Sequence, residues 1–336
     1  MSGTSHSSLC RMPSSNPTPK PKILVTDSAV WVPKLYQIGE VYQNPDEGQM
    51  PRDKLLEHVR DAEALFCLLR DKIDKDLLDH AKNLKMIGTM SVGYEHIDVK
   101  ECKARGIRIG YTPEVLTEAT AELGVALLLA TARRIPEAVQ SAKTGGWTTW
   151  TPYYMCGKAL LESTIGIYGM GTIGKNIAEK LLPFKPNRIL YHNRRPIKDE
   201  GESPFTYVSF EDLLKESDFL IICATPTEEN IGLFNKNVFV RMKNDSILIN
   251  VARGILVNLN DLYEALKNKE IGAAGLDVTN PEPLPVDHPL FGLANCIILP
   301  HIGSATFGTR NLMVSTTEDN IYNFITGKPM TSELMV

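Results

Sequence analysis

The sequence predicts an α/β protein with two Rossmann-like domains, each built on a parallel sheet. Short apolar runs alternate with helical patterns from Lys22 to Ile302, which is typical of parallel sheets covered by helices. One apolar run leads directly into a glycine motif at Gly169, as strands of dinucleotide-binding units do. At 336 residues the chain is also too long for one ordinary hydrophobic core.

The first half of the chain predicts a smaller sheet followed by a packed helix. We expect the helix from about Thr117 to Arg133; its most apolar part, Leu123–Ala132, is half of the roughly 20 residues that a membrane span requires. We therefore predict no membrane partner. The expected strands of this sheet are Ile23–Val25, Ala64–Leu69, Met86–Thr89 and Ile107–Ile109.

A second, more regular series begins at Ser163. Its expected strands are Thr164–Tyr168, Arg188–His192, Phe219–Cys223, Ser246–Asn250, Ala273–Asp277 and Cys296–Leu299. Its expected helices are Ile173–Leu182, Phe210–Glu216, Lys236–Met242 and Asn260–Asn268. A last helix, from about Ala305 to Thr326, is long enough to cross back onto the first domain.

Composition excludes several classes of function. A net charge of −4 without a basic run argues against nucleic acid as a partner, because phosphate binding needs a basic face. The six scattered cysteines form no C-x-x-C pair, so we expect no metal and read them as small core residues. Reduced thiols and no secretory signal favour the cytoplasm. Residues 1–21 are rich in Ser, Pro and Thr and predict a disordered tail, with a mitochondrial transit peptide as the alternative.

The glycine motif predicts a phosphate-binding turn. In Gly169-Met-Gly171-Thr172-Ile173-Gly174 the first glycine allows a tight turn, the second lets a pyrophosphate approach the backbone, and the third permits close packing of helix on strand. The N–H groups at the helix start would face the phosphates. The alternative is a glycine turn that serves packing alone.

The end of the next expected strand predicts which dinucleotide binds. NAD-selective sites place an acid there to accept a hydrogen bond from the ribose 2′-hydroxyl. This chain has His192 and then Asn193, Arg194, Arg195 and Pro196, with no acid. Guanidinium groups bind a 2′-phosphate in bidentate fashion, so NADP(H) is favoured and NAD(H) remains possible. Two solvated loop arginines are the alternative interpretation.

Three further motifs each follow an expected strand, and they carry an arginine, a glutamate and a histidine. His301 can donate a proton to a carbonyl oxygen as a hydride reaches the carbon. Glu282, between two prolines in a stiff loop, can orient that imidazole. Arg253 can grip the carboxylate of a 2-oxo acid through a contact worth ~1.5–3 kcal/mol. Each also has a structural interpretation, as a core histidine, a loop acid or a surface arginine.

Other residues have less defined expected roles. Asp277, at a strand end, can contact the nicotinamide side of a cofactor or hold Arg253. The loop Ser91–Tyr94 in the first domain offers backbone N–H groups as a second anion contact, or is a plain turn. Trp147 and Trp150 are expected to be buried or interface aromatics.

Taken together, these motifs resemble the D-isomer-specific 2-hydroxyacid dehydrogenase family, and within it the glyoxylate reductase/hydroxypyruvate reductase branch. The resemblance runs from about Lys22 to Leu334. It is carried by Ser91–Gly93, Gly169–Gly174, Asn250–Gly254, Gly275–Pro285, Asp287–Leu290 and Pro300–Ser304.

The resemblance implies NADPH-dependent reduction of small 2-oxo acids, glyoxylate to glycolate and hydroxypyruvate to D-glycerate. It implies that His301, paired with Glu282, is the proton donor, and that Arg253 binds the substrate carboxylate. The other implied substrate contacts are Val92, Gly93, Ser304 and Trp150. The implied cofactor contacts are Gly171, Thr172, Ile173, Asn193, Arg194, Arg195, Pro196, Val251, Asp277 and Gly303.

The resemblance also implies how the domains are arranged. A substrate-binding domain of residues 22–119 and 302–336 would enclose a nucleotide-binding domain of residues 120–301. Two copies would form a homodimer through the cofactor domains and the Thr117–Arg133 helix, with Trp150 reaching the partner's active site.

Two other functions compete with this interpretation. Phosphoglycerate dehydrogenase is the nearest enzymatic rival, but its long forms carry a regulatory domain that this chain lacks. Formate dehydrogenase-like members carry glutamine where this chain has Glu282. A dinucleotide-sensing transcriptional corepressor has the same fold and can retain the Arg253, Glu282 and His301 set, so the sequence leaves that function open.

Overall fold

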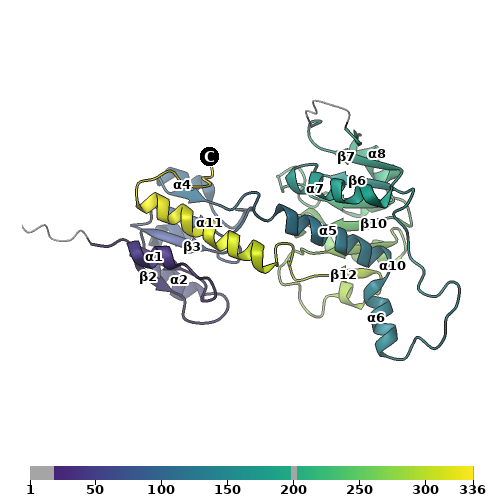
Figure 1. The fold of residues 1–336 in the computed structure, drawn as a ribbon, viewed down its shortest axis with the longest axis horizontal. Helices are drawn as coiled ribbons and strands as arrows, with labels where there is room; N and C mark the ends of the chain where they lie inside the picture. Colours follow the sequence, from purple (N-terminus) through teal and green to yellow (C-terminus); the bar gives the residue numbers. More distant parts are fainter. Residues whose placement is uncertain (1–18, 198–202, 336) are drawn as a thin grey trace, which may run out of the picture. The chain divides into compact units, whose positions relative to one another are not determined.

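The computed structural model describes residues 19–197 and 203–335, and the predicted tail lies outside the described residues except for 19–21. The chain divides into two compact units (Figure 1). The first unit joins Met1–Pro113 to Met313–Val336, and the second is Glu114–Leu312. The sheet in each unit is parallel, so the predicted α/β fold class is confirmed.

The sequence predicts divisions at residues 119 and 301, whereas the compact units divide at Pro113 and Leu312, and local hydrogen bonds hold the connecting segments to the second unit. Glu118 accepts hydrogen bonds from Asn176 and Lys180, which fastens the start of the long helix. The backbone N–H groups of Ile302 and Gly303 bond to a carboxylate of the second unit. The boundaries therefore lie at Pro113 and Leu312.

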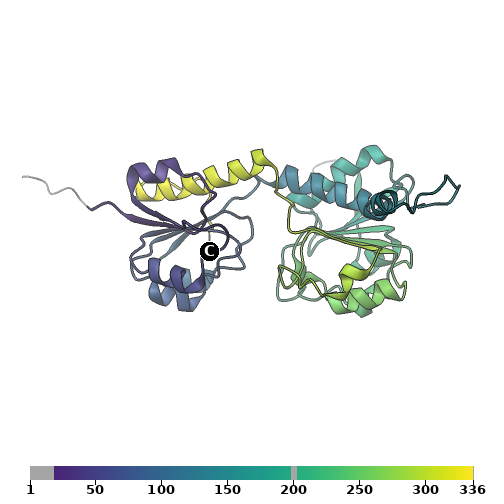
Figure 2. The ribbon, with the colours of Figure 1, turned by 90° about the horizontal axis from the view of Figure 1, so that it is seen from below.

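The first unit is a five-stranded sheet with helices on both faces, in the order β2-β1-β3-β4-β5. Figure 2 shows α1 and α11 on one face and the α2 to α4 helices on the other. The strands are β1 (Lys22–Val25), β2 (Glu40–Gln43), β3 (Ala64–Cys67), β4 (Met86–Thr89) and β5 (Arg108–Gly110). The helices are α1 (Pro33–Ile38), α2 (Arg52–His58), α3 (Lys75–His80), α4 (Val99–Ala104) and, from Met313 onward, α11 (Phe307–Ile325).

Side-chain size decides how each face of this sheet is covered. Leu24, Leu65 and Ile87 are fully buried and pack in one core with residues of α2, α3 and α4. On the other face Gly110 leaves room for α11, because a Cβ there would lie 2.7 Å from the Cβ of Asn320. The long helix thus lies directly on the backbone of β5.

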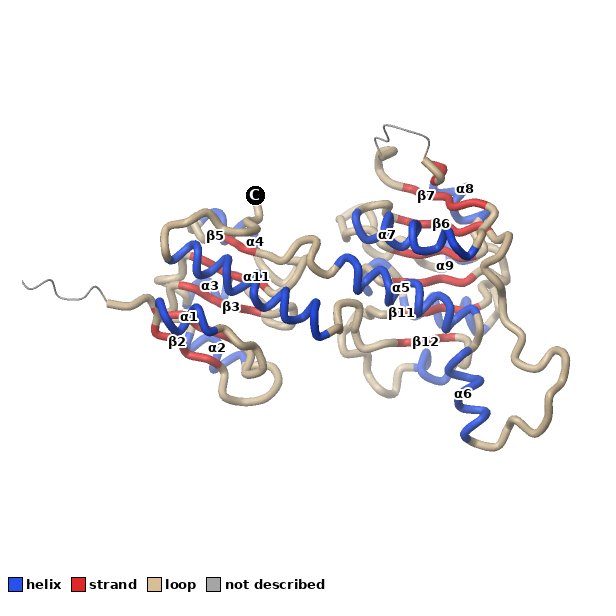
Figure 3. The backbone as a smooth tube through the Cα atoms, in the orientation of Figure 1, coloured by secondary structure: helices blue, strands red, loops and turns tan. Residues whose placement is uncertain are grey.

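The second unit is a seven-stranded sheet in the order β12-β11-β10-β9-β6-β7-β8, seen with its helices in Figure 3. Its strands are β6 (Thr164–Tyr168), β7 (Arg188–His192), β8 (Phe205–Tyr207), β9 (Phe219–Ile222), β10 (Ile247–Asn250), β11 (Ala273–Leu276) and β12 (Cys296–Ile298). Its helices are α5 (Thr117–Ala132), α6 (Ile135–Lys143), α7 (Thr172–Leu181), α8 (Phe210–Glu216), α9 (Lys236–Phe239) and α10 (Leu259–Lys267). Short 3-10 helices cover Leu182–Phe184, Gly254–Leu256 and Pro289–Gly292.

Two hydrophobic clusters cover the two faces of this second sheet. Helix α5 contributes Leu127 and Leu128 to a cluster shared with α7, so the predicted packed helix is confirmed. The other cluster joins the sheet to α8, α9 and α10. Among the described residues, no helix combines the length and the apolar composition that a membrane crossing needs.

The structure also contains elements that the sequence did not predict. The strands β2 and β8 lie at the edges of their sheets, and α6 has no buried residue. Several predicted ends shift: β5 begins at Arg108, β3 ends at Cys67, α9 stops at Phe239 and α11 begins at Phe307. Figure 3 shows α6 and the loop after it extending away from the sheet of the second unit.

Candidate active site

The three glycines after β6 have three different surroundings. Gly169 has φ +100°, and a Cβ there would lie 2.5 Å from the backbone nitrogen of Ala224. A Cβ on Gly174 would lie 2.2 Å from the Gly169 carbonyl oxygen. A Cβ on Gly171 would meet nothing within 4 Å. The first and third glycines therefore make the turn compact, while the second faces open space where a phosphate group fits.

The end of β7 is fastened to this glycine turn. The Asn193 side-chain oxygen accepts a hydrogen bond of 2.7 Å from the Met170 backbone N–H, and the His192 carbonyl accepts one of 3.0 Å from Gly169. Arg194, Arg195 and Pro196 follow as exposed residues, and Thr172 and Ile173 begin α7. The structure gives Asn193, a predicted cofactor contact, a supporting role in the shape of the turn.

His301 and Glu282 are hydrogen bonded to each other. The Nδ1 atom of His301 lies 2.9 Å from Oε2 of Glu282, and the other carboxylate oxygen accepts the Thr279 backbone N–H at 3.0 Å. The Glu282 carboxylate is therefore held at both oxygens. Because Nδ1 donates to a carboxylate, Nε2 is the ring nitrogen that is left to exchange a proton.

Opposing effects act on the Glu282 carboxyl. Burial raises its pKa, but the hydrogen bond and positive charge of His301, the Thr279 N–H and the charge of Arg253 outweigh burial and hold the pKa below its usual value. The Glu282 carboxyl therefore ionises more readily than an ordinary glutamate, and the ionised form is the state that an orienting carboxylate requires.

Asp277 holds the backbone around His301. Its two carboxylate oxygens accept the N–H groups of Ile302 and Gly303, each at 2.8 Å, and its carbonyl accepts the His301 N–H at 2.9 Å. The side chain is 2% exposed, and burial raises its pKa, while the bonds from Ile302 and the charge of His301 oppose that effect. His301 has φ +53°, a conformation that these three bonds stabilise.

The loop that carries Arg253 is held by a buried asparagine. The Asn250 side chain donates to the Arg253 carbonyl at 2.9 Å and accepts from the Ala252 N–H at 3.0 Å. The next residue, Gly254, lies against the other loop, because a Cβ there would be 2.0 Å from the Thr279 carbonyl atoms. The arginine loop and the glutamate loop are therefore in backbone contact.

Strand order explains why these residues gather. The strands β10, β11 and β12 are neighbours in the sheet, and Arg253, Asp277 and His301 follow their carboxyl ends. Ligands of open α/β sheets bind along that edge. Val251 is buried beside the same edge, and Ser304 is half-buried after the histidine.

The remaining predicted residues lie elsewhere. In the first unit, Val92 and Gly93 follow β4, where the Ser91 hydroxyl donates to the Gly93 carbonyl at 2.7 Å and fixes the turn. Trp150 is 78% exposed and Trp147 is 64% exposed, in the loop after α6. The expectation that these tryptophans are buried within the chain is wrong, because that loop extends beyond the packed core; an interface role stays a prediction.

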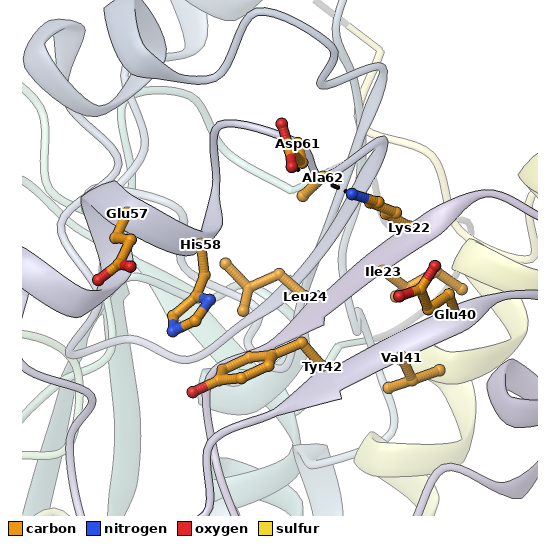
Figure 4. Close-up of a pocket in the computed structure, with 10 residues that line it drawn as sticks. All are labelled: Lys22, Ile23, Leu24, Glu40, Val41, Tyr42, Glu57, His58, Asp61 and Ala62. Atoms are coloured by element: carbon orange, nitrogen blue, oxygen red, sulfur yellow. Dashed lines mark hydrogen bonds and ion pairs between the residues drawn. The ribbon is translucent and has the colours of Figure 1, made fainter.

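The first unit has a cavity of about 350 Å³ beside β1, β2 and α2 (Figure 4). It is lined in part by Tyr42 and His58, whose rings stack at 3.7 Å, and by the Lys22–Asp61 ion pair at 3.0 Å. None of the predicted site residues lines it.

Sequence reasoning missed the groups that support the site. The Thr279 N–H that holds Glu282 is a backbone group, and no pattern of residue types signals it. Asn250 begins the motif that contains Arg253, and a buried polar residue at a strand end is a signal that could have revealed its role.

Comparison with known proteins identifies the family. A family model described as the NAD binding domain of D-isomer specific 2-hydroxyacid dehydrogenases matches residues 125–303. Glyoxylate reductase/hydroxypyruvate reductase of Homo sapiens is 50% identical over 297 residues, covering 88% of this chain and 90% of that protein. Glyoxylate reductase of Pyrococcus horikoshii is 40% identical over 316 residues, covering 92% and 94%.

A solved structure gives the same result. The NADPH-dependent glyoxylate/hydroxypyruvate reductase of Sinorhizobium meliloti, in complex with NADP and malonate, superposes with a TM-score of 0.80 at 31% identity. The match covers 94% of this chain and 97% of that one. The chain therefore belongs to the D-isomer specific 2-hydroxyacid dehydrogenase family and is an oxidoreductase of that family.

Proposed function

We propose that this enzyme reduces glyoxylate to glycolate and hydroxypyruvate to D-glycerate with NADPH. The observation that carries the proposal is the His301–Glu282 hydrogen bond of 2.9 Å at the edge of the sheet that also carries Arg253 and the glycine turn. The human relative, at 50% identity, is named for both reductions.

The glycine turn fits a dinucleotide. Gly171 has open space above it, and α7 begins at Thr172 with backbone N–H groups that suit phosphate oxygens. Gly169, Ile173, Gly174, Val251 and Gly303 would line the cofactor, and Arg194 and Arg195 would hold a 2′-phosphate. When bound, the nicotinamide supplies the hydride that reduces the substrate C2.

His301 supplies the proton. With Nδ1 bonded to Glu282, the charged imidazole donates from Nε2 to the carbonyl oxygen, which becomes the hydroxyl of the product. The developing negative charge on that oxygen is neutralised by the same proton. Glu282 remains a carboxylate throughout and stabilises the charged ring before the transfer.

Arg253 binds the substrate carboxylate in this proposal. A guanidinium forms two parallel hydrogen bonds with a carboxylate and so fixes both its position and its plane. The N–H groups of Val92 and Gly93, with Ser304, would add further contacts. Both proposed substrates share the 2-oxo acid core that this set recognises.

A steady-state assay of glyoxylate and hydroxypyruvate reduction with NADPH and with NADH tests the activity. We expect turnover of both substrates and a higher kcat/KM with NADPH. A corepressor-like binding protein would bind the dinucleotide with negligible turnover, which would refute the proposal.

Arg253→Ala tests the carboxylate contact. We expect the KM for glyoxylate to rise about 10–100-fold, which corresponds to the loss of one charge-assisted hydrogen-bonded pair, while the Kd for NADPH stays unchanged. Arg241→Ala is a matched control, because Arg241 pairs with Glu211 in the same unit. An unchanged KM would remove Arg253 from substrate binding.

We further infer a homodimer in a reducing compartment such as the cytoplasm. The exposed aromatic residues Trp147, Trp150 and Tyr153 on the loop after α6 support a surface that a second copy covers. The cysteines of the described residues are free thiols. Light scattering of the purified chain tests the assembly, and a monomer at micromolar concentration would contradict it.

A further inference from the structure

The last residue of β7, His192, stands where NAD-selective relatives of this fold carry an acid. Its ring lies among aromatic side chains. Its ring centroid is 6.1 Å from that of Tyr168, at 11° between planes, and 5.8 Å from that of Tyr207, at 20°. Phe210 of α8 lies 5.8 Å away at a tilt of 53°. These neighbours fix the plane of the imidazole, which is half-buried.

Hydrogen bonding determines which ring nitrogen of His192 can titrate. Nδ1 lies 2.9 Å from the carbonyl oxygen of Val208. A carbonyl oxygen can only accept, so Nδ1 carries a hydrogen whether the ring is neutral or charged. The proton that the ring gains or loses therefore sits on Nε2, for which the described residues provide no hydrogen-bond partner. Neutral Nε2 is an acceptor, and protonated Nε2 is a charged donor.

The strand end that carries His192 is coupled to the glycine turn. Its carbonyl accepts the Gly169 N–H at 3.0 Å, and the next side chain, Asn193, accepts the Met170 N–H at 2.7 Å. In this fold the residue at the end of the second strand faces the adenosine ribose, because the pyrophosphate lies on the neighbouring turn. His192 is therefore held beside the 2′ position of a bound dinucleotide.

We propose that His192 selects between NADPH and NADH according to its protonation. With Nε2 protonated, it donates a charge-assisted hydrogen bond to the 2′-phosphate of NADPH; with Nε2 neutral, it accepts one from the 2′-hydroxyl of NADH. This inference rests on the proposed use of NADPH. It adds to Arg194 and Arg195 a contact that changes with pH, so the preference for NADPH increases as the pH falls.

The charged groups around the ring are compatible with this behaviour. Burial raises the pKa of Tyr168, so that phenol is uncharged where an imidazole titrates. The loop after β7 carries the guanidinium groups of Arg194 and Arg195, whose positive charge a bound 2′-phosphate would neutralise. On α8 the two acids next to Phe210 have other partners: Glu211 pairs with Lys215 and Arg241, and Asp212 bonds to Ser209. Tyr207 of β8 donates its hydroxyl to the Asn193 carbonyl at 3.3 Å.

Equilibrium binding of NADPH and of NADH to the intact chain, from about pH 5.5 to about pH 8.5, tests the proposal across the range in which histidine titrates. We expect the ratio of the NADH Kd to the NADPH Kd to fall about tenfold as the pH rises, since one charge-assisted hydrogen bond is lost. In His192→Gln the ratio should follow only the titration of the 2′-phosphate itself, which is common to both proteins.

Two variants complete the design. His192→Asp places an acid at the 2′ position and should reverse the preference toward NADH at every pH, which keeps the test valid if the glutamine variant folds poorly. His58→Gln is the matched control, because His58 also stacks on a tyrosine but lies in the first unit; its Kd ratio should equal that of the parent chain.

The outcomes separate the two proposals. If the parent chain prefers NADPH and His192→Gln keeps the same change of the Kd ratio with pH, the role of His192 is overturned and NADPH use stands. If the parent chain shows no NADPH preference at any pH, the proposed cofactor is overturned and the selection by His192 with it. The inference is supported if the ratio of the two Kd values changes less with pH in His192→Gln than in the parent chain and in His58→Gln.

Discussion

The two carboxylates beside His301 differ in almost every physical respect. Glu282 is partly exposed, has a lowered pKa and bonds to the imidazole side chain. Asp277 is buried and has a raised pKa, and its carboxylate oxygens accept hydrogen bonds from the backbone N–H groups of Ile302 and Gly303. One acid contacts the ring itself, and the other contacts the backbone that carries the ring. Residue type alone therefore does not reveal which part of a neighbouring histidine an acid holds.

The largest expected effect comes from removing the imidazole on which both acids act. His301→Ala should lower turnover by ~10²–10⁴-fold, as expected for loss of a general acid. If Glu282 acts only through the ring, adding Glu282→Gln to His301→Ala should change turnover little further. Single-turnover rates with NADPH and glyoxylate measure both variants. Near-normal turnover in His301→Ala would contradict its role as the proton donor. A turnover in the double variant that equals the product of the two single losses would show that Glu282 does not act through the ring.

Asp277→Asn should have the next largest effect. The amide group must turn its NH₂ toward one of two backbone N–H donors, which costs ~1–3 kcal/mol and displaces the His301 loop. We expect kcat to fall about 10–100-fold, with a shift of its pH profile smaller than the shift that Glu282→Gln causes, because Asp277 and His301 also interact through their charges. Asp261→Asn is the control, since Asp261 also accepts a backbone N–H, from Lys236 at 3.1 Å, on α10. A shift as large as that of Glu282→Gln would mean that Asp277 acts mainly through the charge of the ring and not through the position of the loop.

Glu282→Gln should act mainly on the pH profile of the reaction. In the proposed mechanism the charged imidazole donates the proton, and Glu282→Gln removes the negative charge that stabilises it. The pH at which reductive kcat/KM is half lost should therefore fall by about one unit, with activity recovering toward acid pH. Glu264→Gln on α10 should leave the profile unchanged. A uniform loss at all pH values would point to a purely positional role for Glu282.

The smallest effects concern stability, and their signs are opposite. The lowered pKa of Glu282 gives stability that is present above its unfolded-state pKa and lost as the pH falls through the folded-state pKa. The raised pKa of Asp277 means that the free energy of unfolding falls as the pH rises from its unfolded-state pKa through the folded-state pKa. Urea unfolding of Glu282→Gln, of Asp277→Asn and of the parent chain, from about pH 3.5 to about pH 7, measures the free energy of unfolding of each. The difference between parent and variant should change with pH in opposite directions for the two variants. Slopes of the same sign would contradict the contrast.

The sequence predicts the buried strands well but misses two of the four edge strands of the described sheets. Strands such as Ile247–Asn250 are wholly buried, so they appear as continuous apolar runs. The edge strands Glu40–Gln43 and Phe205–Tyr207 alternate with polar residues over only a few positions, and no apolar run marks them. The short helices of the first unit are also hard to predict, because six or seven residues make too few turns for a clear helical period of apolar residues.

A similar division holds for the site. The bond between His301 and Glu282 agrees with what the sequence predicts, because both residues follow neighbouring parallel strands whose ends meet. The supporting bonds of Asp277 depend on backbone N–H groups that every residue possesses, so the residue type at positions 302 and 303 carries no information about them.

The backbone contact at Gly254 has a consequence for redesigning the enzyme's substrate range. Even a methyl group there would collide with the Thr279 carbonyl, so the loops that present Arg253 and Glu282 cannot be moved apart or re-angled one at a time. We therefore expect substitutions at Gly254 without a matching change in the Thr279 loop to disturb both loops. Substitutions at positions outside this backbone contact should leave the His301–Glu282 pair undisturbed, so they are better starting points for new specificity.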